Sequence, residues 1–291
     1  MKKKHKKWKE RKWELGFLLP SLIGVSVFFV VPFGVIFYYS MVDSPIDPRF
    51  VFLRNFVNLF HNSAFLQAAK NTAVFSLTAV PLAVLLPLGM AIILEQNIPL
   101  RSTFRTFFLT PLMVPTASIV LIWQVFFHYN GAINQFLVHL GAGKIDWFKS
   151  SFSQVIVLLL FLWKNLGYNM ILFLAALNDI PREYMEVADL DGASAWQKFI
   201  YIKIRYLSPT ILFVAIMSLI NSFKVFREVY LLTGDYPYDT LYMLQHFMNN
   251  TFKALDYQKL SAAAIIMCSV MVVIIGLLFV VENHFGKDVE G

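Results

Sequence analysis

Ala262-Ala-Ala-Ile-Ile-Met-Cys-Ser-Val-Met-Val-Val-Ile-Ile-Gly-Leu-Leu-Phe-Val-Val281 is a long apolar run that contains no charged side chain. A helix needs about 20 such residues to cross the hydrocarbon core of a bilayer, so this run predicts a membrane span. The whole chain follows the same pattern, with 58% hydrophobic and 15% charged residues, whereas an average soluble domain has about half and a quarter. This composition excludes a soluble globular protein.

Five other segments share this composition, and together they predict an all-α membrane protein with about six transmembrane helices. Phe17–Tyr39 is too long for the apolar part of a signal peptide, and no small-residue cleavage site follows it, so we expect it to be a retained helix. The expected spans are Phe17–Tyr39, Ala69–Leu94, Phe107–Phe127, Val155–Leu177, Tyr206–Phe223 and Ala262–Val281.

The orientation of these spans follows from the basic residues at the start of the chain. Lysines and arginines cluster between Lys2 and Lys12 and contribute much of the net charge of +7. Such a cluster beside a first span holds that end in the cytoplasm, and no nucleic-acid-binding motif follows it. We therefore expect a basic cytoplasmic segment (1–14), a transmembrane domain (15–284) and a cytoplasmic tail (285–291). Residues 178–205 then form a cytoplasmic loop, and 224–261 an external one.

The cytoplasmic loop 178–205 carries the signatures of two short helices. Pro181 suits a first helical turn, and Glu183 and Glu186 place negative charge near the helix start, where the dipole favours it. Gly192 suits the left-handed position after a helix, and Ser194 with Gln197 has the spacing of a capping box. Two capped helices in a loop suggest a surface that docks into a groove on a partner; a helix lying on the membrane surface is the alternative.

Within this loop, Glu186-Val-Ala-Asp-Leu-Asp-Gly192 resembles the E-A-A-x-x-x-G loop of binding-protein-dependent ABC importer permeases. In that family the loop forms a coupling helix that fits a cleft on a cytoplasmic ATPase. Val187 replaces the first alanine of the motif, and Arg205 stands where a proline is usual. The resemblance implies that ATPase coupling is carried by residues of this loop, namely Glu183, Glu186, Val187, Ala188, Asp191 and Gly192.

Four further stretches resemble the carbohydrate subfamily, which includes maltose, multiple-sugar and glycerol-phosphate permeases. They are Phe50–Phe56, Asn71-Thr72, Asn130–Asn134 and Phe226–Gly234 with Thr240. The resemblance implies a type I ABC importer permease fold in a prokaryotic inner membrane. It also implies that the chain forms half of the pathway for a carbohydrate or related polyol. The expected partners are a second homologous permease, two ATPase subunits, an extracytoplasmic solute-binding protein and membrane lipid, but no nucleic acid.

The sequence lacks the motifs of an enzyme. It contains no G-x-x-x-x-G-K-[ST] phosphate loop, its six histidines lack metal-ligand spacing, and no catalytic constellation is recognisable. We expect no catalytic residue, no metal and no cofactor on this chain, with ATP consumed by the partner ATPases. A membrane-embedded enzyme would need clustered catalytic groups, and a self-sufficient secondary transporter would need acidic residues inside the spans, which contain almost none.

A few polar residues within or beside the spans are candidates for the substrate pathway, because polar groups at membrane depth usually face a cavity or a neighbouring helix. Asn165 and Asn169 are four residues apart and share one helix face. Asn221, Lys224 and Phe226 lie at the end of the fifth span and just beyond it. These residues either face a polyol in the pathway or form hydrogen bonds between helices.

Overall fold

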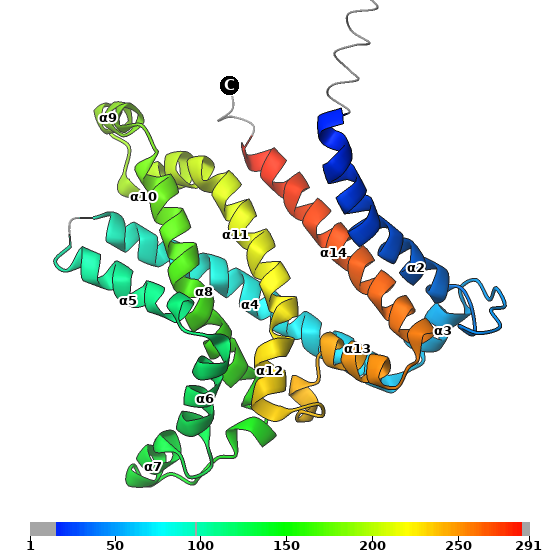
Figure 1. Ribbon diagram of the computed structural model, residues 1–291. Coiled ribbons are helices and arrows are strands. Elements are labelled where there is room, and N and C mark those ends of the chain that lie inside the picture. The colour runs from blue at the N-terminus through cyan, green and yellow to red at the C-terminus, as the bar shows by residue number, and fades with distance from the viewer. Residues whose placement is uncertain (1–15, 97, 287–291) are drawn as a thin grey trace, which may run out of the picture. The chain divides into compact units, whose positions relative to one another are not determined.

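The computed structural model describes residues 16–96 and 98–286, which are mainly helical and contain no named strand (Figure 1). Five of the described helices are long and apolar enough to cross a membrane, and a bent pair can supply a sixth span. This confirms the all-α membrane fold. The five are Gly16–Ser40, Ser63–Glu95, Ser153–Asn178, Ala195–Thr233 and Tyr257–His284. The basic segment 1–14 and most of the tail 285–291 lie outside the described residues.

The expected third span, Phe107–Phe127, is wrong as a single helix. The structure divides this region into α5 (Arg101–Met113) and α6 (Thr116–Phe127), followed by α7 (Ala132–His139). The helical segments on either side of the break are bent by 101°. Val114 is extended, with ψ 130°, because the ring of the following proline disfavours the helical conformation of the residue before it. Pro115 therefore ends α5, whereas Pro111 is accommodated inside it.

The expected fifth span, Tyr206–Phe223, is too short. The helical run Ala195–Thr233 consists of α10 (Ala195–Lys198), a π-helical turn η3 (Phe199–Lys203), α11 (Ile204–Lys224) and α12 (Phe226–Thr233). Residues 226–233 were expected in an external loop, yet Glu228, Val229 and Leu232 of α12 are buried. The external connection therefore begins after Thr233, with η4 (Asp239–Leu241) and α13 (Leu244–Lys253).

The chain divides into two compact units, of which the first comprises residues up to 62 together with 251–270. Its described part holds the helix Gly16–Ser40, with the π-helical turn η1 (Ser26–Val30) and α2 (Val31–Ser40), then α3 (Arg54–Phe60) and the first part of α14 (Tyr257–Gly286). The Asn55 side chain donates hydrogen bonds to the carbonyl oxygens of Ser40 (3.0 Å) and Val42 (2.8 Å). Phe52 has a positive φ of 50°, a conformation that glycine adopts more readily.

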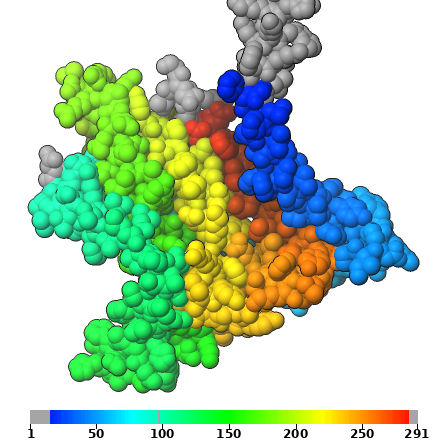
Figure 2. Space-filling view, viewed as in Figure 1, coloured from blue at the N-terminus to red at the C-terminus, as the bar shows by residue number. Residues whose placement is uncertain are grey.

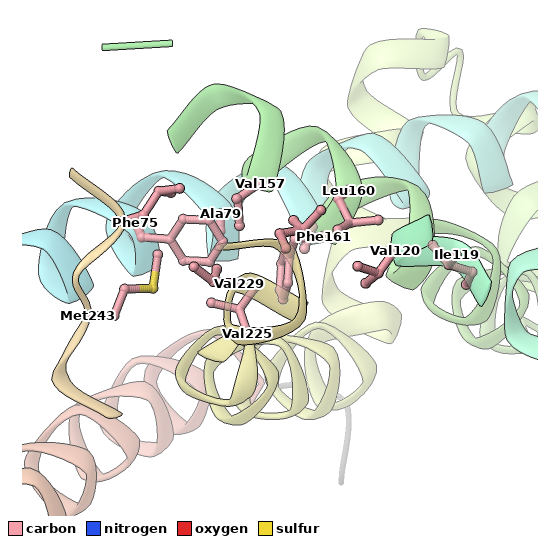
Figure 3. Packing of buried hydrophobic residues seen from close by; sticks show 13 residues of the cluster. Phe75, Ala79, Ile119, Val120, Val157, Leu160, Phe161, Val225, Val229 and Met243 are labelled. Atoms are coloured by element: carbon pink, nitrogen blue, oxygen red, sulfur yellow. The ribbon is translucent and has the colours of Figure 1, made fainter. Parts of the chain in front are cut away.

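The second unit, residues 63–250 and 271–291, is built around three helices that pack on one another: α4 (Ser63–Glu95), α8 (Ser153–Asn178) and α11. One apolar cluster joins α4 and α8 to α12 through Phe75, Phe161 and Val229 (Figure 3). A second cluster nearer the cytoplasmic ends includes Phe173 and Leu207.

At one end of this second unit, polar residues of the motif stretches form hydrogen bonds between segments that are distant in the sequence. Asn71 Nδ2 donates to the carbonyl oxygen of Tyr242 (3.0 Å), and Thr72 Oγ1 accepts from Leu244 N (2.8 Å). Thr240 Oγ1 lies 2.7 Å from Ser153 Oγ. These bonds hold the connection between α12 and α13 against the start of α4 and, just after the 3₁₀ turn η2 (Trp147–Lys149), the start of α8.

Candidate functional site: a cytoplasmic helix and a polar cavity

The first candidate site is the helix α9 (Arg182–Leu190), which lies in the loop predicted to be cytoplasmic and stands out from one end of the second unit (Figures 1 and 2). Pro181 is its N-cap rather than its first helical residue, and Glu183 lies in its first turn. Gly192 has a φ of +75°, which confirms the left-handed position predicted for it. Gly192 N donates to Asp189 O (3.1 Å) and Ala193 N to Ala188 O (2.9 Å). This pair of bonds is a Schellman motif, which satisfies carbonyls that the helix end leaves free.

The next helix, α10, starts where the capping box was predicted. Ser194 Oγ accepts from Gln197 N (3.3 Å), and Gln197 Oε1 accepts from Ser194 N (2.8 Å). These reciprocal bonds satisfy two backbone donors at the helix start. Both bonds join Ser194 to Gln197, so the start of α10 is fixed by short-range chemistry.

No residue of α9 is buried. Tyr184, Val187, Leu190 and, on α10, Trp196 are all exposed, with Leu190 at 88%. Apolar side chains gathered at an exposed helix mark an interaction surface. Of the residues predicted to couple to an ATPase, Glu183, Glu186, Val187, Asp191 and Gly192 are exposed and Ala188 is half-buried.

One ion pair joins the two helices of this loop, and a second ion pair and a ring contact connect the loop to the spans. Lys198 Nζ lies 2.5 Å from Asp189 Oδ1, which joins α10 to α9. Lys203 Nζ lies 2.5 Å from Glu95 Oε2 at the end of α4, and the rings of Tyr184 and Tyr206 are 5.5 Å apart. These contacts link α9 to α10 and α11, and η3 to the end of α4.

The second candidate site is a cavity of about 410 Å³ between α5, α8, α11 and α12. Lys164, near the middle of α8, forms an ion pair with Glu228 of α12 and lies 3.2 Å from Thr116 Oγ1 of α6. The polar lining residues are Lys164, Asn165, Tyr168, Asn221, Lys224, Arg227 and Glu228.

The structure brings together three of the five residues predicted for the substrate pathway. Asn221 Nδ2 donates to Asn165 Oδ1 (3.0 Å), and both residues line the cavity with Lys224. Asn169 is buried and donates to Ala83 O (2.8 Å) and Ser218 Oγ (3.2 Å), so it joins helices instead. Phe226 contacts the His246 ring at a centroid distance of 4.6 Å and does not line the cavity.

Sequence reasoning missed Glu228, Arg227 and Tyr168. The sequence analysis predicts an external loop for Arg227 and Glu228, because the apolar run of the fifth span ends at Phe223. Lys164 is a sequence signal that could have indicated Glu228, since a cation in the middle of a span needs a counter-charge. Among the described residues no group of three or more His, Cys, Asp or Glu is placed to hold a metal ion.

Comparison with known protein families shows to which family this chain belongs. The model of the family described as "binding-protein-dependent transport system inner membrane component" matches residues 83–290. The chain belongs to this family. It is therefore a multi-pass inner-membrane permease of a transport system that depends on a binding protein. It is neither an enzyme nor a self-sufficient secondary transporter.

Several relatives of this permease match along most of its length. The lactose transport system permease protein of Rhizobium radiobacter is 30% identical over 274 residues, 90% of this chain and 91% of the relative. The trehalose/maltose permease protein of Thermococcus litoralis is 29% identical and covers 97% of this chain and 98% of its own. The sn-glycerol-3-phosphate permease protein of Yersinia enterocolitica is 29% identical and covers 89% of each.

The fold of this permease also has a solved counterpart. A chain from a bacterial ABC transporter for import of the acidic polysaccharide alginate superposes with a TM-score of 0.81 at 23% identity, over 98% of this chain and 100% of that one. This confirms the expected ABC importer permease fold.

Proposed function

We propose that this permease forms half of the pathway of an ATP-driven importer for a carbohydrate or related polyol. The relatives named for lactose, trehalose/maltose and sn-glycerol-3-phosphate support the solute class. In this proposal the other half is a second, similar permease, two cytoplasmic ATPase subunits supply the energy, and a binding protein delivers the solute from outside. The chain itself binds no cofactor, and ATP is used by the partner subunits.

The observation that carries the proposal is the exposed, doubly capped helix α9. Its apolar residues are exposed although nothing in its local structure requires this. An amphipathic helix of this kind is suited to lie in a groove on another protein. When the ATPases close, a helix seated on them moves with them, and the contacts to Glu95 and Tyr206 pass the motion to α4 and α11. In this account Glu183, Glu186, Val187, Ala188, Asp191 and Gly192 serve coupling and not catalysis.

The polar cavity is the part of the pathway that this chain contributes. Asn165, Asn221 and Lys224 offer donors and acceptors of the kind that sugar hydroxyls require, and Tyr168 adds an aromatic face beside them. Val225, at which α11 passes into α12, also lines the cavity.

The coupling role is tested with Gly192→Trp. A residue with a side chain is strained at φ +75°, and the indole would occupy space at the end of the docking surface. We expect the tagged wild-type permease to co-purify with its ATPase and to support ATP hydrolysis in lipid, and the variant to lose both while still reaching the membrane.

The control is Gly141→Trp, because Gly141 also has a positive φ, +81°, with no atom within 4 Å of an added Cβ, and lies in the loop after α7, outside the loop of α9. The proposal predicts that this variant keeps the ATPase. Retention of full ATPase activity by Gly192→Trp would contradict the coupling role.

A further inference from the structure

The polar cavity carries an excess of positive charge. Three cationic residues line it, Lys164, Lys224 and Arg227, but only one anionic residue, Glu228. Glu228 is occupied, because it is paired with Lys164. Lys224 and Arg227 form no ion pair and no side-chain hydrogen bond with any of the described residues, and both are exposed. Two positive charges therefore remain without a counter-charge from the part of the chain that the structure describes.

These charges lie deep in the spans. Lys164 is near the middle of α8, and the Asn165–Asn221 hydrogen bond places the end of α11 at the same level. Lys224 ends α11 there, and Arg227 lies in the first turn of α12, which continues outward to Thr233. An uncompensated cation at membrane depth is costly and marks a solute or ion pathway. The first turn of α12 also lines the cavity.

We infer that the cavity selects an anionic carbohydrate, one that carries a carboxylate, phosphate or sulfonate group. This inference rests on the proposed function, because it assigns a charge to the solute of the same pathway. Lys224 and Arg227 attract the anionic group, and the guanidinium of Arg227 can hold it with two hydrogen bonds. The amides of Asn165 and Asn221 and the Tyr168 hydroxyl are left for the sugar hydroxyls. Glu228 keeps Lys164 in place and does not cancel the two free charges.

The test measures the charge preference of the cavity directly and needs no knowledge of the natural solute. Leu112 lines the cavity from α5 and is 49% exposed, so Leu112→Cys with Cys268→Ala leaves one reporter thiol on this chain, and the same importer with Cys268→Ala alone supplies the background rate. Its reaction rates are measured with an anionic methanethiosulfonate (sulfonatoethyl) and a cationic one (trimethylammonioethyl). The anion-to-cation rate ratio is divided by that of a free thiol in solution.

We expect this normalised ratio to exceed one. Lys224→Gln and Arg227→Gln should each lower it about fivefold, because the two reagents differ by two charges and each cation acts across several ångströms of partly aqueous space. Lys70→Gln, which removes an exposed lysine of α4 outside the cavity, should leave it unchanged. A ratio of one or less, or a ratio that Lys224→Gln and Arg227→Gln do not change, would overturn the inference.

A second measurement asks whether the cavity recognises sugars by charge. D-glucuronate and D-glucose differ at the C6 carboxylate, and we expect millimolar glucuronate to slow modification of the reporter thiol more than glucose does. Equal effects of the two sugars, including no effect of either, would count against the inference. Failure of the importer proposal would be seen separately, as an ATPase that remains bound and active in Gly192→Trp.

Discussion

At the scale of single residues, buried amides of the motif stretches act as structural fasteners. Asn134 is fully buried; its Nδ2 donates to the carbonyl oxygens of Tyr129 (3.0 Å) and Ile145 (2.7 Å), and its Oδ1 accepts from Ile145 N and Trp147 Nε1, both at 3.1 Å. One side chain thus closes the loop between α7 and η2. The side-chain amides of Asn55 and Asn71 also donate to backbone carbonyl oxygens of other segments. These residues of the motif stretches therefore stabilise the fold.

Replacing Asn134 by alanine should therefore destabilise the external side of the protein. Several buried donors and acceptors would lose their partner, each at a cost of about 1 kcal/mol or more, and we expect a total loss of roughly 2–4 kcal/mol. Thermal unfolding of the purified permease measures this loss. Asn130→Ala is the control, because Asn130 is exposed and its loss should cost much less; equal costs for the two variants would contradict the role assigned to Asn134.

His246 on α13 predicts a dependence of stability on pH. The side chain is fully buried, and burial lowers its pKa to about 4, although Asp235 acts in the opposite direction. In the unfolded chain its pKa is about 6.5. As the pH falls from 7 towards 4, the unfolded chain takes up a proton that the folded protein does not bind, so stability is lost across this window. Below pH 4 both forms bind the proton, and the loss from this group stops.

The loss should reach at most about 3 kcal/mol, and it is seen as a fall in melting temperature between pH 7 and pH 5. His246→Asn keeps an acceptor for the Met243 N–H, which His246 Nδ1 accepts at 3.3 Å, but cannot titrate. The variant should show a smaller fall than the wild type. An unchanged pH slope would mean that other groups cause it.

At the scale of helices, the packing of α5 on α8 depends on one glycine. A methyl group at Gly167 would lie 1.9 Å from the carbonyl oxygen of Phe108, and this backbone atom can move only if α5 moves. Gly167→Ala should therefore push α5 away from α8 and lower the yield of folded protein severalfold, with a stability loss of about 3 kcal/mol or more.

Gly89→Ala is the matched control for this substitution, since Gly89 lies inside α4 with no atom within 4 Å of the added methyl group. Alanine there should be neutral or slightly stabilising, because it favours the helix. Both variants are compared by the fraction that elutes as a single species after extraction from the membrane. Comparable yields would show that α5 adjusts without cost.

The helices also show which features the sequence could predict. The caps at Gly192 and Ser194 were predicted correctly, because their causes lie within a few residues of each other along the chain. The break at Pro115 and the extension of the fifth span through α12 were missed. In α12 the polar sequence Arg227-Glu228 is typical of a loop, and the burial of Glu228 depends on its ion pair with Lys164, 64 residues earlier. Hydropathy along the chain cannot include a counter-charge that only the fold supplies.

The same limit applies to the candidate site. Asn165, Asn221 and Lys224 could be named from the sequence because polar groups in or beside apolar runs are conspicuous. Asn169 belongs to the same helix face, yet the fold turns its amide to Ala83 and Ser218. Spacing indicates a shared face, whereas only the packing of α4 and α11 decides which asparagine reaches the cavity.

At the scale of the whole molecule, the chain combines an exposed apolar helix on the cytoplasmic side with a charged cavity inside the spans. The two regions are joined by α8 and α11, which run from the cytoplasmic loop to the cavity. In the proposed mechanism a movement of α9 passes along the same helices that carry Asn165 and Asn221. Under the proposed function, this arrangement would give the partner ATPase a mechanical route to the solute.

Leu190 distinguishes the two roles considered for α9. Its side chain is 88% exposed at the end of the helix. If α9 docks on the ATPase, Leu190→Asp places a charge in an apolar contact and should weaken association by about 2 kcal/mol, or roughly thirtyfold in Kd, while the melting temperature of the isolated permease stays the same. If α9 lies on the lipid surface, the variant should instead change the melting temperature of the permease alone and leave ATPase binding intact. Leu140→Asp, at a 66% exposed leucine after α7, is the control. Titration of the purified ATPase onto each permease in lipid nanodiscs decides between them, because only docking predicts that Leu190→Asp, and not Leu140→Asp, loses affinity.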